Sequence, residues 1–409
     1  MNKEKGRVPK LRFPGFTEDW EQCKLGEIFE YLQNNTLSRD SLNYKNPNIK
    51  NIHYGDILVK FDEILDGSNK DIPYINSGLD LSKFSKSLLR DGDIIFSDTA
   101  EDDTVGKAIE LQNVNAPFIL GGLHTIPCRP LITFGKGYLG NFLNSDSYRL
   151  QLRPLIQGIK VSSISKSALK DTMIEYPKNL DEQEKIGSLF YYIAKMITLH
   201  QRKLEHLNLK KKALLQKLFP KNGERYPELR FLGFTNAWEQ RKLGDIVDFL
   251  DGQRKPLKES ERTKGKYPYY GASGIIDYIS DYLFDENLVL LSEDGANIID
   301  RNYPVCFIAT GQYWVNNHAH VLKVKTGIID KFICESLERL DYTKFNTGTA
   351  QPKLNQDICQ KIVITIPNED EQKYISEFLD RINNIITLHQ RKLEHLQLQK
   401  KALLQQMFV

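Results

Sequence analysis

Residues 197–219 read ITLHQRKLEHLNLKKKALLQKLF, and residues 386–408 read ITLHQRKLEHLQLQKKALLQQMF. Nineteen of these 23 positions are identical at an offset of 189 residues. Apolar side chains recur at alternating spacings of three and four residues, which is the heptad pattern of a coiled coil. The stripe expected to face a partner helix contains matching residues in the two copies: Ile197, His200, Leu204 and Leu207, then Ile386, His389, Leu393 and Leu396.

The heptad pattern extends upstream of both quoted stretches and predicts two long helices, over about 181–219 and 370–408. Acidic residues begin each segment, where the helix dipole favours negative charge. At 1.5 Å per residue each helix is roughly 57 Å long. A whole domain separates the helices, so the chain can run along one and return along the other. We expect an antiparallel pair within one chain, and pairing between two chains is the alternative.

A second repeat precedes each of the two central regions. Residues 9–32 and 227–250 share 15 of 24 positions at an offset of 218 residues, whereas the centres that follow share almost no identity. Gene duplication with drift would spread the differences more evenly, so the pattern favours a fixed scaffold that carries two exchangeable readers. The predicted domains are a first reading domain (1–180), a first long helix (181–220), a second reading domain (221–369) and a second long helix (370–409).

Both centres contain short apolar runs between Gly, Asn and Asp residues, as at 91–96 and 287–291. This punctuation is typical of short strands with intervening loops. The predicted fold class is α+β, with two β-rich domains joined by two long antiparallel coiled-coil helices in a pseudo-two-fold arrangement. The aromatic residues of the second repeat are expected to anchor each domain by packing: Phe13, Phe16 and Trp20, then Phe231, Phe234 and Trp238.

The composition is that of an ordinary globular protein. Fifty-six Lys and Arg against 53 Asp and Glu leave a formal net charge of +3, which argues against a polybasic or acidic disordered protein. Five dispersed cysteines without a CxxC motif fit a reducing compartment. No apolar run approaches the ~20 residues needed to cross a bilayer. We expect a cytoplasmic protein without a membrane partner.

Two loops that follow the second repeat are rich in basic and amide side chains. Lys and Arg suit phosphates, while Arg and Asn also read base edges. A solvated loop is the competing interpretation, and charge alone favours it. The candidate DNA contacts are Arg39, Asn43, Lys45, Asn48 and Lys50 in the first loop, and Arg254, Lys255, Lys258, Arg262, Lys264 and Lys266 in the second.

Two groups of residues are incomplete as catalytic or metal sites. Asp181, Glu182 and Lys185 have the residue types of a nuclease site, but they lie in a predicted first helical turn rather than on a strand. His318, His320 and Cys306 lack a fourth zinc ligand. No GxxxxGK[ST] loop and no GxSxG elbow occur. We therefore expect no catalytic residue and no bound metal, which favours a binding or adaptor subunit.

Several stretches resemble the specificity subunits of type I restriction–modification systems. The pattern LRFxGFxxxWExxKLG occurs at 11–26 and again at 229–244, and both long helices begin near a DEQ triplet. The second centre adds YYGASG at 269–274 and GTAQPKLN at 348–355, while 157–166 matches the latter only loosely. On this resemblance the candidate DNA contacts also include Lys160, Lys166, Gln351, Lys353 and Asn355.

The resemblance implies a division of labour. Each centre would be a target recognition domain that reads one half of a bipartite site in double-stranded DNA, and the helices would set the unread spacer. The chain would hold no cofactor and catalyse nothing. It would recruit two methyltransferase (modification) subunits, which use S-adenosylmethionine, and restriction/translocase subunits, which use ATP and Mg²⁺.

Two other functions compete with this interpretation. A structural coiled-coil adaptor would share the helices, but it would not need two unlike domains with basic loops. A stand-alone methyltransferase would need a cofactor loop and an Asn/Asp-Pro-Pro-aromatic segment, which the sequence lacks.

Overall fold

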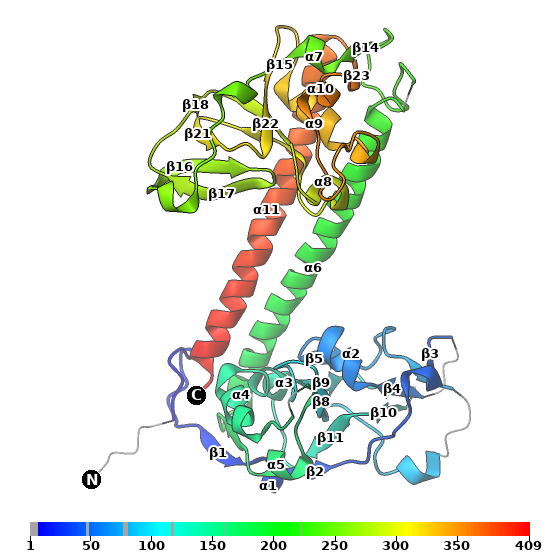
Figure 1. Ribbon diagram of the computed structural model, residues 1–409. Helices are drawn as coiled ribbons and strands as arrows, with labels where there is room; N and C mark the ends of the chain where they lie inside the picture. Colours follow the sequence, from blue (N-terminus) through cyan, green and yellow to red (C-terminus); the bar gives the residue numbers. More distant parts are fainter. Residues whose placement is uncertain (1–6, 46–48, 77–80, 116–117, 159, 222) are drawn as a thin grey trace. The chain divides into compact units, whose positions relative to one another are not determined.

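The structure is a computed structural model that describes residues 7–45, 49–76, 81–115, 118–158, 160–221 and 223–409. The chain divides into two compact units, unit 1 (1–202 with 390–409) and unit 2 (203–389). Two long helices, α6 (Leu180–Leu218) and α11 (Glu369–Met407), each contribute to both units (Figure 1). Their bounds agree with the sequence prediction to within one residue.

The two long helices run antiparallel within one chain, as predicted. In unit 1, Phe190 near the start of α6 stacks on Phe408, which follows the end of α11, with ring centroids 5.8 Å apart. In unit 2, Phe219 at the end of α6 shares a core with Leu379 near the start of α11. The start of one helix thus packs with the end of the other in each unit.

The predicted heptad stripe is the less exposed side of each helix. Leu204, Leu393 and Leu396 are buried, while Leu209 and Leu398 on other faces are 68% and 69% exposed. This burial supports the predicted seam. The remaining seam residues are half-buried: Ile197, His200, Leu207, Ile386 and His389.

A lysine interrupts the apolar stripe of each helix and finds a carboxylate in its own unit. Lys400 Nζ donates to both carboxylate oxygens of Glu63, at 2.7 and 2.8 Å. Lys211 Nζ lies 3.5 Å from Glu335 Oε1. The polar breaks in the heptad pattern therefore join the helices to the domains.

Unit 1 contains a five-stranded sheet that is buried on both faces. Ile94 and Phe96 join one core while Ile95 joins another, because successive side chains of a strand point to opposite faces. The sheet order is β2-β11-β7-β9-β5, and a second sheet has the order β10-β4-β6-β3. The strands of the first sheet are β2 (Phe29–Tyr31), β11 (Thr125–Pro130), β7 (Ile94–Ser97), β9 (Ala108–Gln112) and β5 (Ile64–Asp66), and those of the second are β10 (Ile119–Gly121), β4 (Lys50–Ile52), β6 (Tyr74–Ile75) and β3 (Leu42–Asn43).

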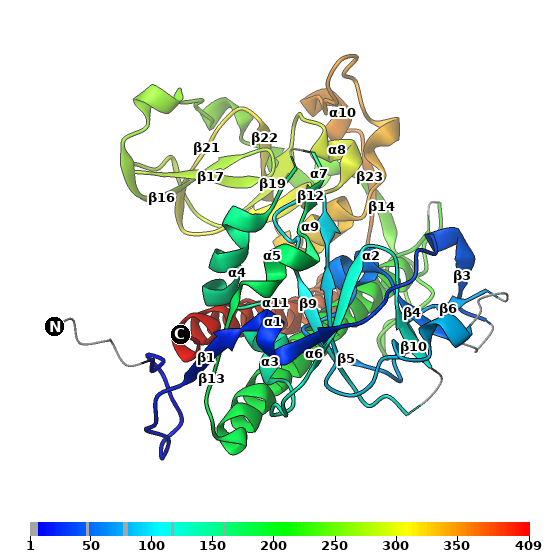
Figure 2. The same ribbon diagram turned by 90° about the horizontal axis from the view of Figure 1, so that it is seen from below.

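Two strand pairs and several short helices complete unit 1. Figure 2 shows β1 beside β13, which pair antiparallel and join the N-terminal repeat to the segment before α6. The pairs are β1 (Glu21–Lys24) with β13 (Met173–Tyr176), and β8 (Thr99–Ala100) with β12 (Ser162–Ser163). The helices are α1 (Leu25–Ile28), α2 (Tyr54–Val59), α3 (Tyr138–Phe142), α4 (Asp146–Leu152) and α5 (Lys166–Lys170).

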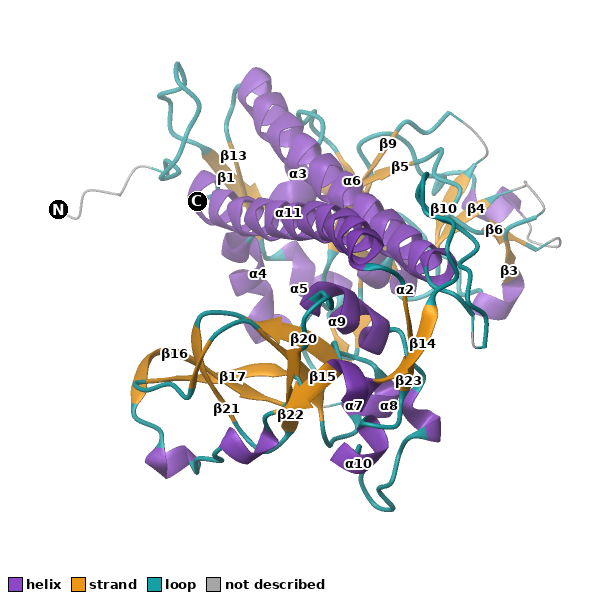
Figure 3. Cartoon of the chain, turned by 90° about the horizontal axis from the view of Figure 1, so that it is seen from above, coloured by secondary structure: helices purple, strands orange, loops and turns teal. Residues whose placement is uncertain are grey.

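Unit 2 has the same kind of central sheet, with the order β15-β22-β19-β20. Val289 and Leu291 face one core and Leu288 and Leu290 another, so both faces are again buried. A second sheet, β17-β16-β21-β18, lies beside it (Figure 3). The strands are β15 (Val247–Phe249), β22 (Ala319–Val324), β19 (Leu288–Ser292), β20 (Cys306–Ala309), β17 (Gly274–Ile279), β16 (Lys264–Gly271), β21 (Gln312–Val315) and β18 (Phe284–Asp285), with the pair β14 (Glu239–Lys242) and β23 (Val363–Ile366) and helices α7 (Leu243–Ile246), α8 (Asn297–Asp300), α9 (Asp330–Glu338) and α10 (Gln356–Cys359).

The repeated aromatic segments anchor the domains, as predicted for their tryptophans. Trp20 packs edge-on against Phe408, and Trp238 packs edge-on against Phe219. The arginine of each LRF triplet also binds the DEQ triplet of its own unit. Arg12 donates to both oxygens of Glu182 at 2.6 and 2.8 Å, and Arg230 does the same to Glu371 at 2.8 and 2.7 Å.

The ion pair with Arg12 gives a structural role to Glu182, one of the residues that has the type expected in a nuclease site. Glu182 is completely buried and its carboxylate is neutralised by Arg12. No helix of the described residues is both long enough and apolar enough to cross a membrane.

Candidate nucleic-acid interface

Strand register relates the two centres even though their sequences differ. Cys128 on β11 pairs with Tyr31, and Leu322 on β22 pairs with Phe249. Tyr31 and Phe249 are equivalent in the N-terminal repeat, 218 residues apart. The register therefore equates His124, Thr125 and Ile126 with His318, Ala319 and His320.

A loop docks on the central sheet in the same way in both units. In unit 1 the backbone N–H of Ile164 donates to the carbonyl of Asp98 at 2.9 Å, and in unit 2 that of Leu354 donates to Glu293 at 2.7 Å. The weakly similar segments 157–165, without residue 159, and 347–355 are therefore structural equivalents, which we call the docked loops. The candidate DNA contacts on or next to these loops are exposed: Lys160, Lys166, Gln351, Lys353 and Asn355.

The basic loop of unit 2 contains one internal arginine and several exposed lysines. The Arg254 side chain is only 12% exposed, and its Nη1 donates to Glu293 Oε2 and to the carbonyl of Ala319, both at 2.7 Å. It holds the loop on the sheet and has little surface for a phosphate, which corrects the prediction for Arg254. Lys255 and Lys258 are exposed and remain candidates.

The rest of this basic segment runs into the hairpin formed by β16 and β17. Lys264 and Lys266 are exposed on β16. Arg262 is half-buried, with its guanidinium 4.7 Å from the ring centre of Tyr269. The hairpin also exposes Tyr278, which charge-based reasoning did not select, and aromatic rings are common partners of bases.

The corresponding loop of unit 1 is largely tied into the fold. The guanidinium of Arg39 donates to both oxygens of the buried Asp56, at 2.7 and 2.8 Å. The amide of Asn43 donates to Asn76 Oδ1 at 2.7 Å. Lys45 is exposed. Asn48 lies outside the described residues.

Lys50 is the clearest correction to the predicted site. Its residue is only 2% exposed, and Nζ donates to the carbonyls of Gly67 at 2.6 Å and Asn69 at 2.9 Å. Burial lowers the pKa of its ammonium group. Lys50 therefore binds backbone carbonyls inside unit 1, which argues against the predicted phosphate contact.

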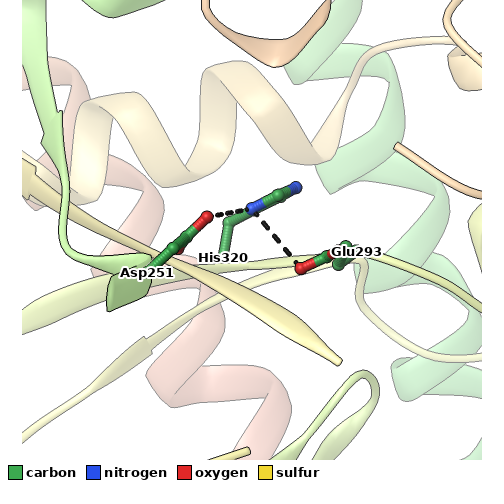
Figure 4. Close-up of side chains that lie close together, drawn as sticks. All are labelled: Asp251, Glu293 and His320. Carbon is green, nitrogen blue, oxygen red and sulfur yellow. Dashed lines mark hydrogen bonds and ion pairs between the residues drawn. The ribbon is translucent and has the colours of Figure 1, made fainter. Parts of the chain in front are cut away.

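Unit 2 contains a buried ionic network next to its docked loop (Figure 4). His320 Nδ1 lies 2.6 Å from Asp251 Oδ2 and 3.7 Å from Glu293 Oε2, while Nε2 lies 2.7 Å from the carbonyl of Leu354. Both ring nitrogens thus face acceptors, which is the arrangement of a protonated imidazolium. Burial alone would lower the pKa of His320, but Asp251 and Cys359 outweigh it and raise the pKa to about 10.

The carboxylates of this network have the residue types of a metal site, but their charge is already compensated. Arg254 binds Glu293 and lies 3.4 Å from Asp251, and both nitrogens of His320 are occupied. The incomplete zinc set suggested by sequence does not assemble either. His318 binds Asp294 instead, and Cys306 is a buried free thiol.

Comparison with known proteins identifies the class. The family described as "Type I restriction modification DNA specificity domain" matches residues 17–209 and 236–398, which is most of the chain. The chain therefore belongs to this family. It is the specificity subunit of a type I restriction–modification system, a non-catalytic component with two target recognition domains.

Individual relatives agree with this assignment. A type I restriction enzyme specificity subunit of Haemophilus influenzae is 33% identical over 162 residues, covering 40% of this chain and 41% of that protein. The MjaX specificity subunit of Methanocaldococcus jannaschii is 22% identical and covers 95% of this chain and 92% of that protein. The crystal structure of an S subunit from M. genitalium has a TM-score of 0.66 at 15% identity, covering 98% and 99% of the two chains. This likeness shows the shared fold.

Proposed function

We propose that each unit reads one half of a bipartite DNA site and that the paired helices fix the unread spacer. The observation that carries the proposal is the contrast within the chain. The two units share strand register, docked loops and helix ends, but they differ in almost every side chain of their centres. A common framework with unlike surfaces suits two readers of two different sequences.

The exposed basic residues supply the expected chemistry for binding DNA. Lys255, Lys258, Lys264 and Lys266 form a run of exposed cations in unit 2, where they can contact phosphates. Gln351 and Asn355 offer amide groups that can pair with adenine edges. Of the candidate DNA contacts in unit 1, the exposed cations are Lys45, Lys160 and Lys166. Lys353 completes the set on the docked loop of unit 2.

The helices support the spacer role because they are long, run antiparallel and each contribute residues to both units. Each has 39 residues, or roughly 58 Å at 1.5 Å per residue. Half-sites one DNA turn apart are separated by about 34–36 Å. The helices are thus long enough to hold two reading surfaces over separate half-sites.

Each unit also exposes apolar residues at equivalent positions of its helices, as expected if two copies of one partner bind. Unit 1 exposes Met196, Leu199 and Leu398, and unit 2 exposes their repeat equivalents Ile385, Leu388 and Leu209. Apolar side chains at matched positions fit two modification subunits, each docked on one unit. Those subunits would supply S-adenosylmethionine chemistry, and restriction subunits would supply ATP- and Mg²⁺-dependent cleavage.

Methylome sequencing of a host that expresses this chain with its modification subunits tests the proposed function. The expected result is a motif with two specified blocks separated by unread bases. A single uninterrupted motif would contradict a division of reading between the units.

The cationic contacts have a separate test in the assembled methyltransferase complex. Replacing both Lys255 and Lys258 by Ala should weaken DNA binding and reduce the slope of log affinity against log salt by about one for each lost phosphate contact. The matched control replaces the exposed Lys361 and Lys373, which lie outside the predicted loops. An unchanged slope in the Lys255/Lys258 variant would show that this loop is only solvated.

A further inference from the structure

A histidine occupies the same position at the start of one central strand in each unit. His124 directly precedes β11 and His318 directly precedes β22. In unit 1 the backbone N–H of Asp98 donates to the carbonyl of His124 at 3.1 Å, and in unit 2 that of Glu293 donates to His318 at 2.9 Å. The two histidines are therefore equivalent, although no sequence similarity connects them.

Each of these histidines binds a carboxylate through the same ring nitrogen. His124 Nδ1 lies 3.2 Å from Asp98 Oδ1, and His318 Nδ1 lies 2.9 Å from both carboxylate oxygens of Asp294. The carboxylate does not come from the same position in the two units. Strand register equates Asp98 with Glu293, whereas the partner of His318 is the next residue, Asp294. The same pair is thus built from two different side-chain positions.

The two pairs are similarly exposed, although His124 Nδ1 also lies 3.3 Å from Thr99 Oγ1 and its ring packs edge-on against Tyr54. The side chains of His124 and His318 are 47% and 49% exposed, and those of Asp98 and Asp294 are 28% and 24% exposed. Both pairs lie beside the docked loop of their unit. Strand pairing joins Ser163 to Thr99, next to Asp98, in unit 1, and a bridge joins Lys353 to Asp294 in unit 2.

Stability does not account for these pairs. Ion pairs at this exposure contribute little to folding, and the surrounding backbone is already held by strand and loop hydrogen bonds. His124 also has a φ angle of 55°, a conformation uncommon in residues other than glycine. Uncommon backbone angles cluster at functional positions.

We propose that His124 and His318 are equivalent base contacts, one in each half-site, and that Asp98 and Asp294 orient their rings. This inference rests on the proposed reading of two half-sites. An Nδ1–H bound to a carboxylate fixes the tautomer and leaves Nε2 as the atom for a ligand. The adjacent carboxylate would repel a phosphate, whereas an unprotonated Nε2 can accept a hydrogen bond from the amino group of adenine or cytosine.

The test uses the complex with its modification subunits and duplexes that carry the site returned by methylome sequencing. His124→Gln and His318→Gln should each lower affinity by roughly tenfold to a hundredfold, the scale of a lost base contact. Each should relax discrimination at one base pair, and the two positions should fall in different half-sites. The slope of affinity against salt should not change.

His206→Gln and His395→Gln provide matched controls, because both histidines are exposed on the long helices. Asp294→Asn should reproduce part of the His318→Gln effect, since it removes the charge that orients the ring. Circular dichroism should show that every variant is folded.

Three outcomes would overturn the inference: unchanged affinity and discrimination in both histidine variants, relaxed discrimination in the same half-site, or a salt slope reduced by about one, which would indicate a phosphate contact. If the wild-type complex itself shows no bipartite preference, the proposed function fails instead.

Discussion

Units 1 and 2 bury different kinds of side chain at one equivalent position of their central sheets. Ile126 in unit 1 and His320 in unit 2 occupy the same register, and each is 1% exposed. The position equivalent to Asp251 is the exposed Gln33 in unit 1, while His320 has Asp251 at 2.6 Å. One unit is therefore apolar at this point and the other is ionic, which shows that the framework is set by backbone pairing rather than by particular core residues.

The charged His320 of unit 2 makes a contact that Ile126 of unit 1 cannot make. His320 Nε2 lies 2.7 Å from the carbonyl of Leu354 and so holds the docked loop through a charged hydrogen bond. Replacing a buried charge pair by apolar residues often leaves stability unchanged, but removing only one partner is strongly destabilising because the other charge stays buried. The docked loop of unit 2 is thus held by an ionic network for which unit 1 has no equivalent at this position.

The largest predicted effects fall equally on the two units and concern the helix ends. Phe219→Ala should destabilise unit 2 and Phe408→Ala should destabilise unit 1, each by about 3–5 kcal/mol, because a buried phenyl ring is replaced by a cavity. Pulsed alkylation of buried cysteines in denaturant measures this, with Cys128 reporting unit 1 and Cys306 reporting unit 2.

Leu209→Ala and Leu398→Ala are the controls for these helix-end variants, because both leucines are exposed and should change stability by less than about 0.5 kcal/mol. Equal destabilisation of both units by either phenylalanine variant would contradict the separate anchoring of each helix end.

A substitution of Arg254 should lower the stability of unit 2 without changing that of unit 1. Arg254→Ala removes the nearest cation from Glu293 and one donor from the carbonyl of Ala319. It is expected to cost unit 2 about 1–3 kcal/mol, since Glu293 keeps only the longer pairs with Lys353 at 3.5 Å and His320 at 3.7 Å. Lys255→Ala, at the neighbouring exposed position, should leave stability unchanged. The same alkylation assay on Cys306 distinguishes the two, and an Arg254 variant as stable as the Lys255 variant would refute the internal role.

The pH dependence of stability should also differ between the units. His320 has a pKa of about 10 in the folded unit and about 6.5 when unfolded, so its contribution is fully present below pH 6.5. That contribution should fall as pH rises toward 10, with a slope of at most about 1.4 kcal/mol per pH unit. Incubation in denaturant at each pH, followed by alkylation at one common pH, should show this slope for Cys306 and not for Cys128.

His320→Ile is the natural comparison for the pH dependence, because isoleucine occupies the equivalent position in unit 1. It should abolish the slope of unit 2. A slope that persists in this variant would assign the pH dependence to other groups.

Much of the fold could be predicted from the sequence because its signals are periodic and local. The heptads located both long helices, and the repeats identified the segments that anchor them. Which candidate DNA contacts are exposed was less predictable, since burial depends on residues far along the chain. Lys50 and Arg254 lie in loops whose composition is typical of phosphate binding. In the structure, however, Lys50 binds the carbonyls of Gly67 and Asn69, and Arg254 binds Glu293.

The equivalent histidines were missed for a related reason. The sequence pattern offers His318 only as a zinc ligand with Cys306 and gives no signal for His124. Nothing in the sequences around them aligns, and only the pairing of β11 with β7 and of β22 with β19 places them at one position.

The most direct test of the account lengthens both helices and measures the preferred spacer. Inserting three heptads after Arg202 and after Arg391 adds roughly 32 Å at 1.5 Å per residue and preserves the heptad phase. At 3.4 Å per base pair this is about nine base pairs, close to one DNA turn of ~10–10.5 base pairs, so the half-sites return to nearly the same face. Affinity of the assembled complex should be measured over duplexes that differ only in spacer length. The account predicts that the half-site bases stay the same and the preferred spacer grows by nine or ten base pairs. An unchanged spacer preference, or altered half-site bases, would contradict it.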